Sequence, residues 1–330
     1  MSALSLEEKL QTNPWPATQG HGVMFILDAR NSLEEDILRR WVGLHQPESV
    51  DKPVIACMDL GDDRKGIDTT ELLNRIELPA DTVVAPLGIT WLPNEEAINS
   101  GPRLRDFLMG DPRRPSPKRG QTIIERAPSR FHLLIGEPDS MENLQGRYRH
   151  KYGVDPSSVL QSFSKFVARQ ATIVLGVTER HLQGGRYKVP RYVAESLQAN
   201  RGFNEAMDAL SAEEGKPKSE LMKESAVYMK EMISIPRTFW LDFYAKFNDF
   251  CLGLGYEDNI VYDRKEIDEL RDVVRDYPSL LLWTHKTYLD GMVVPKVMYE
   301  NDFPMPHMFG GANLSFAGLG FLIRRSGGIF

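Results

Sequence analysis

The chain has 330 residues, of which 42% are hydrophobic, so it is long enough to form more than one domain with a buried core. Its formal net charge of −6 disfavours nucleic acid as a partner. The two cysteines, Cys57 and Cys251, lie far apart and form no metal-binding pattern, which fits a reducing, cytoplasmic setting. No run reaches about 18 consecutive apolar residues, and the N-terminus has no signal-peptide pattern, so neither a spanning helix nor a leader is predicted.

The first region, residues 1–155, alternates strand and helix patterns. The apolar run 23–29 predicts a strand, and the segment 32–44 behind it has helical spacing with Ser32 as the expected N-cap. Three further apolar runs predict strands at 52–60, 81–92 and 130–138. This alternation favours a small α/β unit.

The second region, residues 156–262, is expected to be helical. Apolar residues recur near the 3.6-residue period across 157–185, and the glycine pair at the end of this segment predicts its stop. Pro236 separates this part of the chain from the last helix of the region. The other helices are predicted at 190–215, 218–233 and 237–255.

The third region, residues 263–330, returns to an α/β pattern. Asp263 is the expected N-cap of a helix that ends before Pro278, and the apolar run "SLLLWTH" at 279–285 then predicts a buried strand. Further helices are predicted at 287–302 and 314–327, before a strand-like end at 327–330. The predicted fold class of the whole chain is therefore α/β, with a helical middle.

The join between the predicted strand and the next helix contains His285 and, five residues later, Asp290. On a regular helix these two residues would lie about 140° apart, since each step turns ~100°, so they could not share a face. They can meet if His285 ends the strand and Asp290 lies in the first helical turn, with Thr287 as the N-cap. Asp290 could then accept a hydrogen bond from one imidazole nitrogen, while the other nitrogen takes a proton from a hydroxyl group. No serine or cysteine nucleophile is nearby, so the pattern suits a general base acting on an alcohol.

The same residues also have a purely structural interpretation. Thr287-x-x-Asp290 resembles a capping box in which Asp replaces the usual Glu or Gln. Asp290 is then the acid at the third helical position, and His285 is an ordinary residue at a strand end. On spacing alone this interpretation is the commoner one, because a histidine and an acid five residues apart often occur by coincidence.

The segment that follows changes the balance between these interpretations. Together with "WTHKTYLDG", the segment "HMFGGANLSFAGLGFLIRRSGGIF" resembles the glycerol-3-phosphate 1-acyltransferase family of the large bacterial and mitochondrial type. That family belongs to the glycerolipid acyltransferases with a His-x-x-x-x-Asp block. The resemblance implies that residues 263–330 begin an α/β acyltransferase domain. The matching residues are His285, Asp290, Gly311, Asn313, Leu314, Gly320, Arg324, Arg325 and Gly327.

The resemblance implies a role in phospholipid biosynthesis. His285 would deprotonate the primary hydroxyl of glycerol 3-phosphate, Asp290 would orient His285, and the hydroxyl oxygen would attack the thioester of acyl-CoA or acyl carrier protein. Arg324 and Arg325 are candidate substrate-binding residues, because guanidinium groups bind phosphate bidentately. Gly327, which matches the glycine of the same block, is a third candidate. The alternative for the arginines is a solvated helix C-terminus, where cations are favoured. No metal or redox cofactor is implied, and the expected location is cytoplasmic, peripheral to the inner face of the plasma membrane.

The sequence departs from the family pattern at its end. The family's second block continues beyond Phe330, and its third and fourth blocks have no counterpart in these residues. The chain is therefore expected to be an N-terminal portion of an acyltransferase, with little or no activity alone. An alternative is an inactive remnant or scaffold that binds a partner or a membrane surface, and a third is a hydrolase that uses the His–Asp pair on water.

Overall fold

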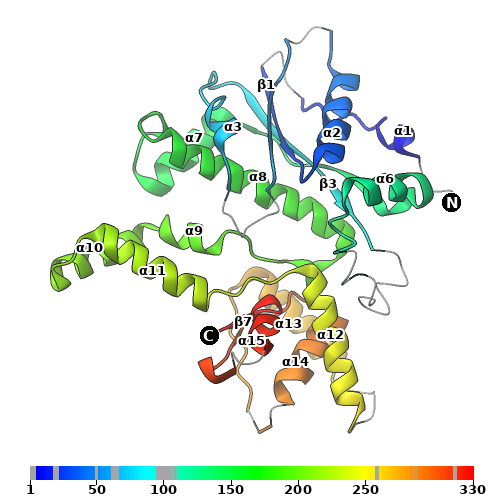
Figure 1. Cartoon of the computed structure of the whole chain (residues 1–330), viewed down its shortest axis with the longest axis vertical. Helices are drawn as coiled ribbons and strands as arrows, with labels where there is room; N and C mark the ends of the chain where they lie inside the picture. The colour runs from blue at the N-terminus through cyan, green and yellow to red at the C-terminus, as the bar shows by residue number, and fades with distance from the viewer. Residues whose placement is uncertain are drawn as a thin grey trace. The chain divides into compact units, whose positions relative to one another are not determined.

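The structure is a computed structural model of the chain. It describes residues 5–17, 22–48, 51–60, 67–93, 106, 110–256, 260–284, 286–287, 289–314 and 318–330. The chain forms two compact units, whose elements are labelled in Figure 1. The first unit comprises 1–94, 108–182 and 195–206, and the second comprises 95–107, 183–194 and 207–330. The three regions predicted above follow composition along the chain, whereas the two units follow packing in space, and the three regions remain a prediction.

The first unit is built on a sheet with the strand order β2-β1-β3-β4. The central strand β1 (Val23–Asp28) pairs in parallel with β2 (Val54–Met58) and with β3 (Val83–Trp91). The strands β4 (Phe131–Ile135) and β5 (Asp139–Ser140) both pair antiparallel with β3. The first five residues of β1 are buried, which is typical of a strand covered on both faces. The four strands predicted in this region are confirmed, and so is the α/β fold class.

Helices cover both faces of this sheet (Figure 1). One face packs against α2 (Ser32–His45) and α6 (Pro117–Arg126), and a core that includes Phe25, Leu38 and Trp91 lies there. The other face lies against α7 (Met141–Tyr152) and α8 (Leu160–Gln183). The short helices α1 (Leu6–Lys9) and α3 (Thr70–Leu73) also belong to this unit.

Two helix ends test the sequence predictions directly. α2 is capped by Asn31, whose side chain accepts a hydrogen bond from the N–H of Glu34 at 3.2 Å, so the prediction of Ser32 as the N-cap is wrong by one residue. Asn31 has an extended backbone and an equally good capping side chain, whereas Ser32 already lies in the helix. α8 ends at Gln183, and Gly184 follows with a φ of 104°, so the predicted glycine stop is confirmed.

The second unit is mostly helical and contains one small sheet in its described part. α13 is capped by Asp263 as predicted, through a hydrogen bond from the N–H of Lys265 at 2.8 Å. The short strands β6 (Met308–Phe309) and β7 (Gly328–Ile329) pair in parallel, which confirms the predicted strand-like end. The main helices are α11 (Lys218–Met232), α12 (Thr238–Gly253), α13 (Arg264–Asp276), α14 (Asp290–Glu300) and α15 (Leu319–Arg325), while α9 (Val193–Gln198) and α10 (Arg201–Glu214) hold residues of both units.

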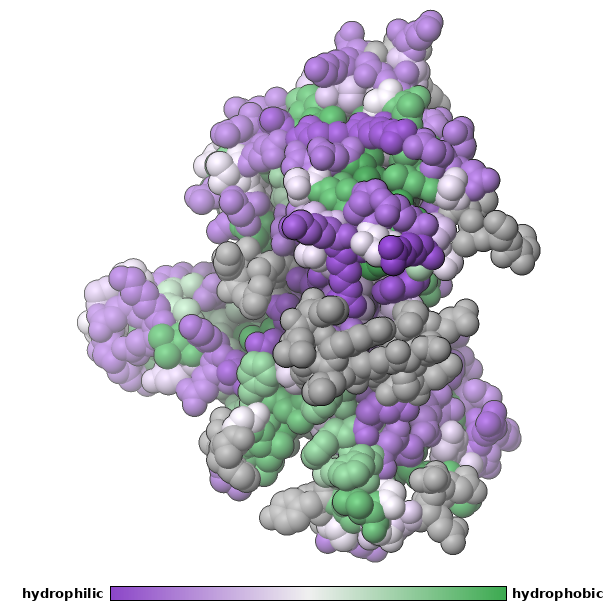
Figure 2. Space-filling model, turned by 45° about the vertical axis from the view of Figure 1, so that its right-hand side comes forward, coloured by the Kyte–Doolittle hydropathy of each residue, from purple (hydrophilic) through white to green (hydrophobic). Residues whose placement is uncertain are grey.

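The predicted buried strand at 279–285 is wrong. Residues 279–284 have no regular structure, and Leu280 and Leu282 are 73% and 87% exposed. A strand needs neighbours that pair with its backbone groups, and the sheet described in this unit consists of two strands of two residues each. Among the described residues, the run at 279–284 pairs with neither of these two strands. Figure 2 shows further apolar side chains, coloured green, on the surface of this unit.

None of the helices among the described residues is long and apolar enough to cross a bilayer.

The helix predicted at 314–327 is shorter than expected. Its described part, α15, begins at Leu319 after Gly318, which has a left-handed φ of 79°.

Candidate functional site

Asp290 is the first residue of α14, and its carboxylate binds the chain segment that precedes the helix. Its Oδ2 atom accepts hydrogen bonds from the N–H of Lys286 at 2.6 Å and from the N–H of Thr287 at 2.9 Å. The hydroxyl of Thr287 accepts a hydrogen bond from the N–H of Leu289 at 3.1 Å. These donors and the N-terminus of α14 both attract negative charge. The aspartate therefore closes a tight turn directly before the helix.

One of the two hydrogen bonds of the predicted capping box is present in this turn. The N–H of Thr287 donates to the carboxylate of Asp290, as the reciprocal bond of a capping box requires. The helix, however, has Leu289 as its N-cap, with no side-chain cap, so the prediction of Thr287 as the N-cap is wrong. The reason is the turn itself, in which the N–H of Asp290 donates to the carbonyl of Thr287 at 3.3 Å and delays the start of the helix.

His285 lies outside the described residues, so its pairing with Asp290 stays a prediction. The structure does place the Asp290 carboxylate on the N–H of Lys286, the residue that follows His285 in the sequence. The carboxylate therefore lies against the backbone of Lys286 and Thr287, before the first turn of α14.

α12 is the scaffold that holds the start of α14. The hydroxyl of Tyr244 donates to the carbonyl of Gly291 at 3.3 Å, and the side-chain amide of Asn248 donates to the carbonyl of Met292 at 3.4 Å. α15, which carries the two candidate arginines, also packs against α12. One helix therefore supports both elements that carry the predicted site residues.

The Arg324 side chain binds the C-terminal end of α11. Its guanidinium donates to the carbonyls of Lys230 and Ile233, where the last turn of α11 leaves carbonyls without helical partners. Its own carbonyl accepts hydrogen bonds from the hydroxyl of Ser234 at 3.0 Å and from the N–H of Ile235 at 2.9 Å. These contacts give Arg324 a structural role, and its predicted contact with phosphate remains a prediction.

Arg325 lies in an aromatic cluster between α12 and α15. Its guanidinium carbon is 4.1 Å from the ring centre of Phe321 and 6.0 Å from that of Trp240, and the two rings meet edge to face. Gly327 has a φ of 118°, and a Cβ atom there would lie 2.9 Å from the carbonyl oxygen of Pro306. The backbone alone therefore requires glycine at 327.

Sequence reasoning missed a buried polar cluster beside this scaffold. The hydroxyls of Tyr187 and Tyr299 donate to the same oxygen of Asp242 at 2.8 and 2.7 Å. Burial first, and the neighbouring Asp242 carboxylate second, raise the pKa of Tyr299 above its usual range. No local pattern could have indicated this cluster, because Asp242 is separated from the two tyrosines by 55 and 57 residues.

A second missed contact joins the glycine pair after α8 to the end of α14. The carboxylate of Asp302 accepts hydrogen bonds from the N–H groups of Gly185 and Arg186 at 2.9 and 3.1 Å, and forms an ion pair with the Arg186 guanidinium at 3.0 Å. Burial acts to raise the pKa of Asp302, but these donors outweigh it and hold the pKa below its usual value. We call this contact the Asp302 latch.

The metal-ligating residues and the Cys57 thiol of the described chain add nothing to this site. No group of three His, Cys, Asp or Glu residues that could hold a metal ion occurs among the residues that the structure describes. Burial, followed by the nearby Glu35 carboxylate, raises the pKa of the Cys57 thiol to about 12. The thiol is therefore protonated at neutral pH and is a poor nucleophile.

The chain is similar to known proteins over part of its length. Over 143 residues it is 32% identical to "Putative acyltransferase plsB1" of Mycobacterium bovis (strain ATCC BAA-935 / AF2122/97) and of Mycobacterium tuberculosis (strains CDC 1551 / Oshkosh and ATCC 25618 / H37Rv). The match covers 43% of this chain and 22% of each relative, so it spans about a fifth of the length of these curated proteins. No family model and no solved structure matches the chain. The comparisons thus connect less than half of the chain to proteins that carry an acyltransferase name.

Proposed function

We propose that this chain carries the first part of a glycerol-3-phosphate 1-acyltransferase, which transfers a fatty acyl group from acyl-CoA or acyl carrier protein to glycerol 3-phosphate. The observation that carries the proposal is the Asp290 carboxylate, bound to the N–H of the residue after His285 at the N-terminus of α14. The partial similarity to proteins named as acyltransferases supports the same class of reaction.

The proposed mechanism is direct transfer with His285 as the general base. The imidazole takes the proton of the primary hydroxyl, and the hydroxyl oxygen forms a bond to the thioester carbonyl carbon. The carbon–sulfur bond then breaks, and the imidazolium gives its proton to the leaving thiolate, which departs as the thiol. Asp290 is a positioning residue in this scheme, since its charge would favour the imidazolium that forms as the proton moves. The N-terminus of α14 offers N–H groups that favour an anion, such as the substrate phosphate. These steps use no metal or redox cofactor.

The proposed partners follow from this reaction. They are glycerol 3-phosphate, the acyl donor, and the inner face of the plasma membrane, into which acyl chains partition. Arg324 and Arg325 remain proposed phosphate ligands, because guanidinium binds phosphate bidentately. For Arg324 this role requires that a phosphate share or replace the carbonyls of α11 that the side chain now binds.

The proposal is tested by transfer of a labelled acyl group from acyl-CoA to glycerol 3-phosphate, in the full polypeptide that contains this chain. We expect His285→Ala to lower kcat by about 10²–10⁴-fold, the usual contribution of a general base. Asp290→Asn keeps an oxygen that can accept from Lys286 and Thr287, so the turn can persist without the charge. The imidazolium then loses its favourable neighbour, and the acidic limb of the pH profile of kcat/KM moves to lower pH.

Asp263→Asn is the matched control, because Asp263 also accepts a backbone N–H at the start of a helix, that of α13. It removes a charge of the same kind outside the turn that precedes α14. If Asp290→Asn gives the same rate and pH profile as Asp263→Asn, then Asp290 only shapes the turn and its positioning role is refuted. An unchanged kcat in His285→Ala would refute the general-base role of His285.

A further inference from the structure

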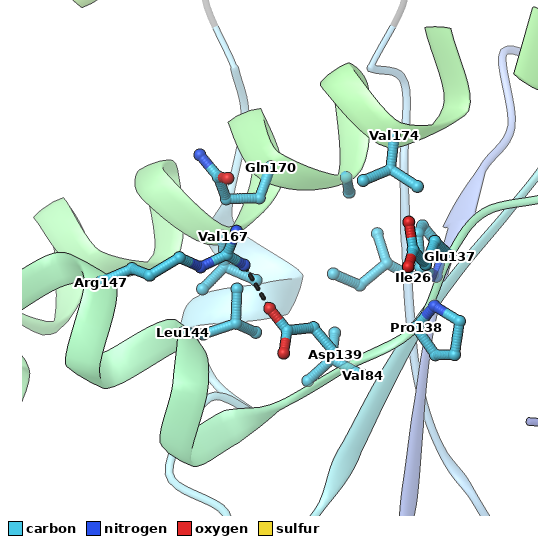
Figure 3. Close-up of a pocket in the computed structure, with 12 residues that line it drawn as sticks. Ile26, Val84, Glu137, Pro138, Asp139, Leu144, Arg147, Val167, Gln170 and Val174 are labelled. Atoms are coloured by element: carbon cyan, nitrogen blue, oxygen red, sulfur yellow. Dashed lines mark hydrogen bonds and ion pairs between the residues drawn. The ribbon is translucent and has the colours of Figure 1, made fainter. Parts of the chain in front are cut away.

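A cavity of about 270 Å³ lies in the first unit between the sheet and helices α7 and α8 (Figure 3). Its floor and walls are apolar. An apolar cavity of about 150 Å³ is sufficient to bind benzene, so this one has room for a ring or short chain that carries a polar head. The apolar lining consists of Ile26, Val84, Pro86, Pro138, Leu144, Val167, Ala171 and Val174.

The cavity opens where the edge of the sheet is interrupted. β4 pairs with β3 only from Leu87 onward, and β5 pairs only with Val83 and Val84, so Pro86 lies opposite the break. The carbonyl of Pro86 accepts the N–H of Gly136 at 2.9 Å. The nitrogen and oxygen of a strand residue point to the same side, so the N–H that proline lacks would also have faced the break. Pro86 therefore accounts for the interruption. The break leaves Glu137 and Pro138, the two residues after Gly136, to line the cavity.

The polar side chains of the cavity lie at its two ends. Figure 3 shows Glu137 at one end and Arg147 with Gln170 at the other, with apolar side chains between them. Asp139 is already engaged, because it forms an ion pair with Arg147 and accepts a hydrogen bond from the side chain of Asn143 at 3.0 Å. Within the described residues, neither the carboxylate of Glu137 nor the amide of Gln170 has a hydrogen-bond or ion-pair partner.

The charged side chains of the lining favour a cationic ligand over an anionic one. Two carboxylates face one guanidinium, so the lining is net negative, and the guanidinium is neutralised by Asp139. An unpaired carboxylate beside an apolar cavity attracts a cation, whereas an anion would meet only repulsion at that end. The amide of Gln170 can hydrogen-bond a polar group at the far end of the ligand.

We propose that this cavity is a binding site for a small amphipathic cation, with an ammonium group on Glu137 and an apolar body between the sheet and helices α7 and α8. The apolar body supplies most of the affinity, because its burial removes hydrocarbon surface from water. The ion pair with Glu137 decides between ligands of equal shape. The inference is independent of acyl transfer, since the cavity belongs to the first unit and Asp290 to the second.

The test compares two probes of the same shape, 2-phenylethylamine and 2-phenylethanol, by isothermal titration and ligand-observed NMR with the whole chain. We expect the amine to bind at millimolar concentration and the alcohol to bind about threefold to fivefold more weakly, which is the effect of an exposed ion pair. Glu137→Gln should bring the amine down to the affinity of the alcohol. The control Glu142→Gln, an exposed acid on α7 outside the lining, should leave both affinities unchanged.

A second pair of variants tests the location. Val174→Trp fills the cavity from a half-buried position on its wall and should abolish binding of both probes. Val177→Trp adds the same side chain at an exposed position one turn further along α8 and should leave binding intact. The proposal is overturned if the amine does not bind, if the alcohol binds as tightly, or if binding survives Val174→Trp.

Discussion

Replacing Tyr299 by phenylalanine tests whether the Asp242 carboxylate depends on two tyrosine hydroxyls. Tyr187 and Tyr299 donate to the same oxygen at 2.8 and 2.7 Å, and Asp242 is only 4% exposed. A hydrogen bond to a charged group contributes ~1.5–3 kcal/mol to stability. Tyr187 still binds the carboxylate in the single variant. We therefore expect Tyr299→Phe to lower the free energy of unfolding by the lower part of that range, about 1.5 kcal/mol.

The pH dependence distinguishes this interaction from a loss of packing. The pKa of Tyr299 is raised by burial and by Asp242, so the folded protein keeps the hydroxyl proton at a pH where the unfolded chain loses it. The stability that depends on the neutral hydroxyl is therefore complete below pH ~10 and is lost as the pH rises above it. For one such group the slope is about 1.4 kcal/mol per pH unit. Tyr299→Phe should remove this part of the alkaline destabilisation.

The assay is urea denaturation followed by far-UV circular dichroism and tryptophan fluorescence between pH ~8 and ~11. Tyr228→Phe is the control, because Tyr228 is 60% exposed on α11. The double variant Tyr187→Phe/Tyr299→Phe should lose more than the sum of the single variants, since both residues bind one carboxylate. The reasoning is refuted if Tyr299→Phe behaves like Tyr228→Phe at neutral pH, or if its stability falls as steeply as that of the unchanged chain at alkaline pH.

Three further predictions concern other contacts. Gly136→Ala places a Cβ atom 2.6 Å from Cγ of Pro86 and should lower the free energy of unfolding by about 1–3 kcal/mol. Gly146 lies on α7, and a Cβ atom there would have nothing within 4 Å, so Gly146→Ala should raise the free energy of unfolding by about 0.5–1 kcal/mol. Urea denaturation of both variants checks the opposite signs. Asn31→Ala should lower the stability by about 1 kcal/mol and Ser32→Ala by much less in the same assay; the reverse order would contradict the observed cap. Asp302→Asn should weaken the acid sensitivity of the fold, because the stability from the Asp302 latch is fully present above the unfolded pKa of ~3.9 and is lost as the pH falls through the lower folded pKa. The Asp302 side chain is 42% exposed, so this contribution stays below about 1 kcal/mol. An unchanged acid transition in the variant would contradict the prediction.

The sheet of the first unit could be predicted because each of its longer strands is a short apolar run between turn residues. The cap of α2 was misplaced by one residue because Asn31 and Ser32 are both good capping residues, and the choice depends on which of them has the extended backbone. The run at 279–285 failed for a different reason. An apolar run indicates a strand only if a sheet is present to pair with it, and sequence periodicity carries no information on that partner.

The candidate site was predictable only in its local part. The position of Asp290 at the start of a helix follows from its spacing to the apolar residues of α14, and this is confirmed. Its hydrogen bonds to the backbone of Lys286 and Thr287 follow from the same short range. The aromatic neighbours of Arg325 and the tyrosines on Asp242 come from segments far apart in the sequence, so no local pattern could indicate them.

The Asp302 latch also has a consequence for how the chain length can vary. It joins residues that are 117 positions apart, so it closes a long loop that contains helices α9 to α14. The entropy of closing such a loop depends only weakly on its length, and halving the loop changes the closure free energy by only about 0.6 kcal/mol. Insertions and deletions in the connection between α10 and α11 should therefore cost little stability. Homologous sequences are expected to differ in length there while they keep Asp302 and the glycine pair that it binds.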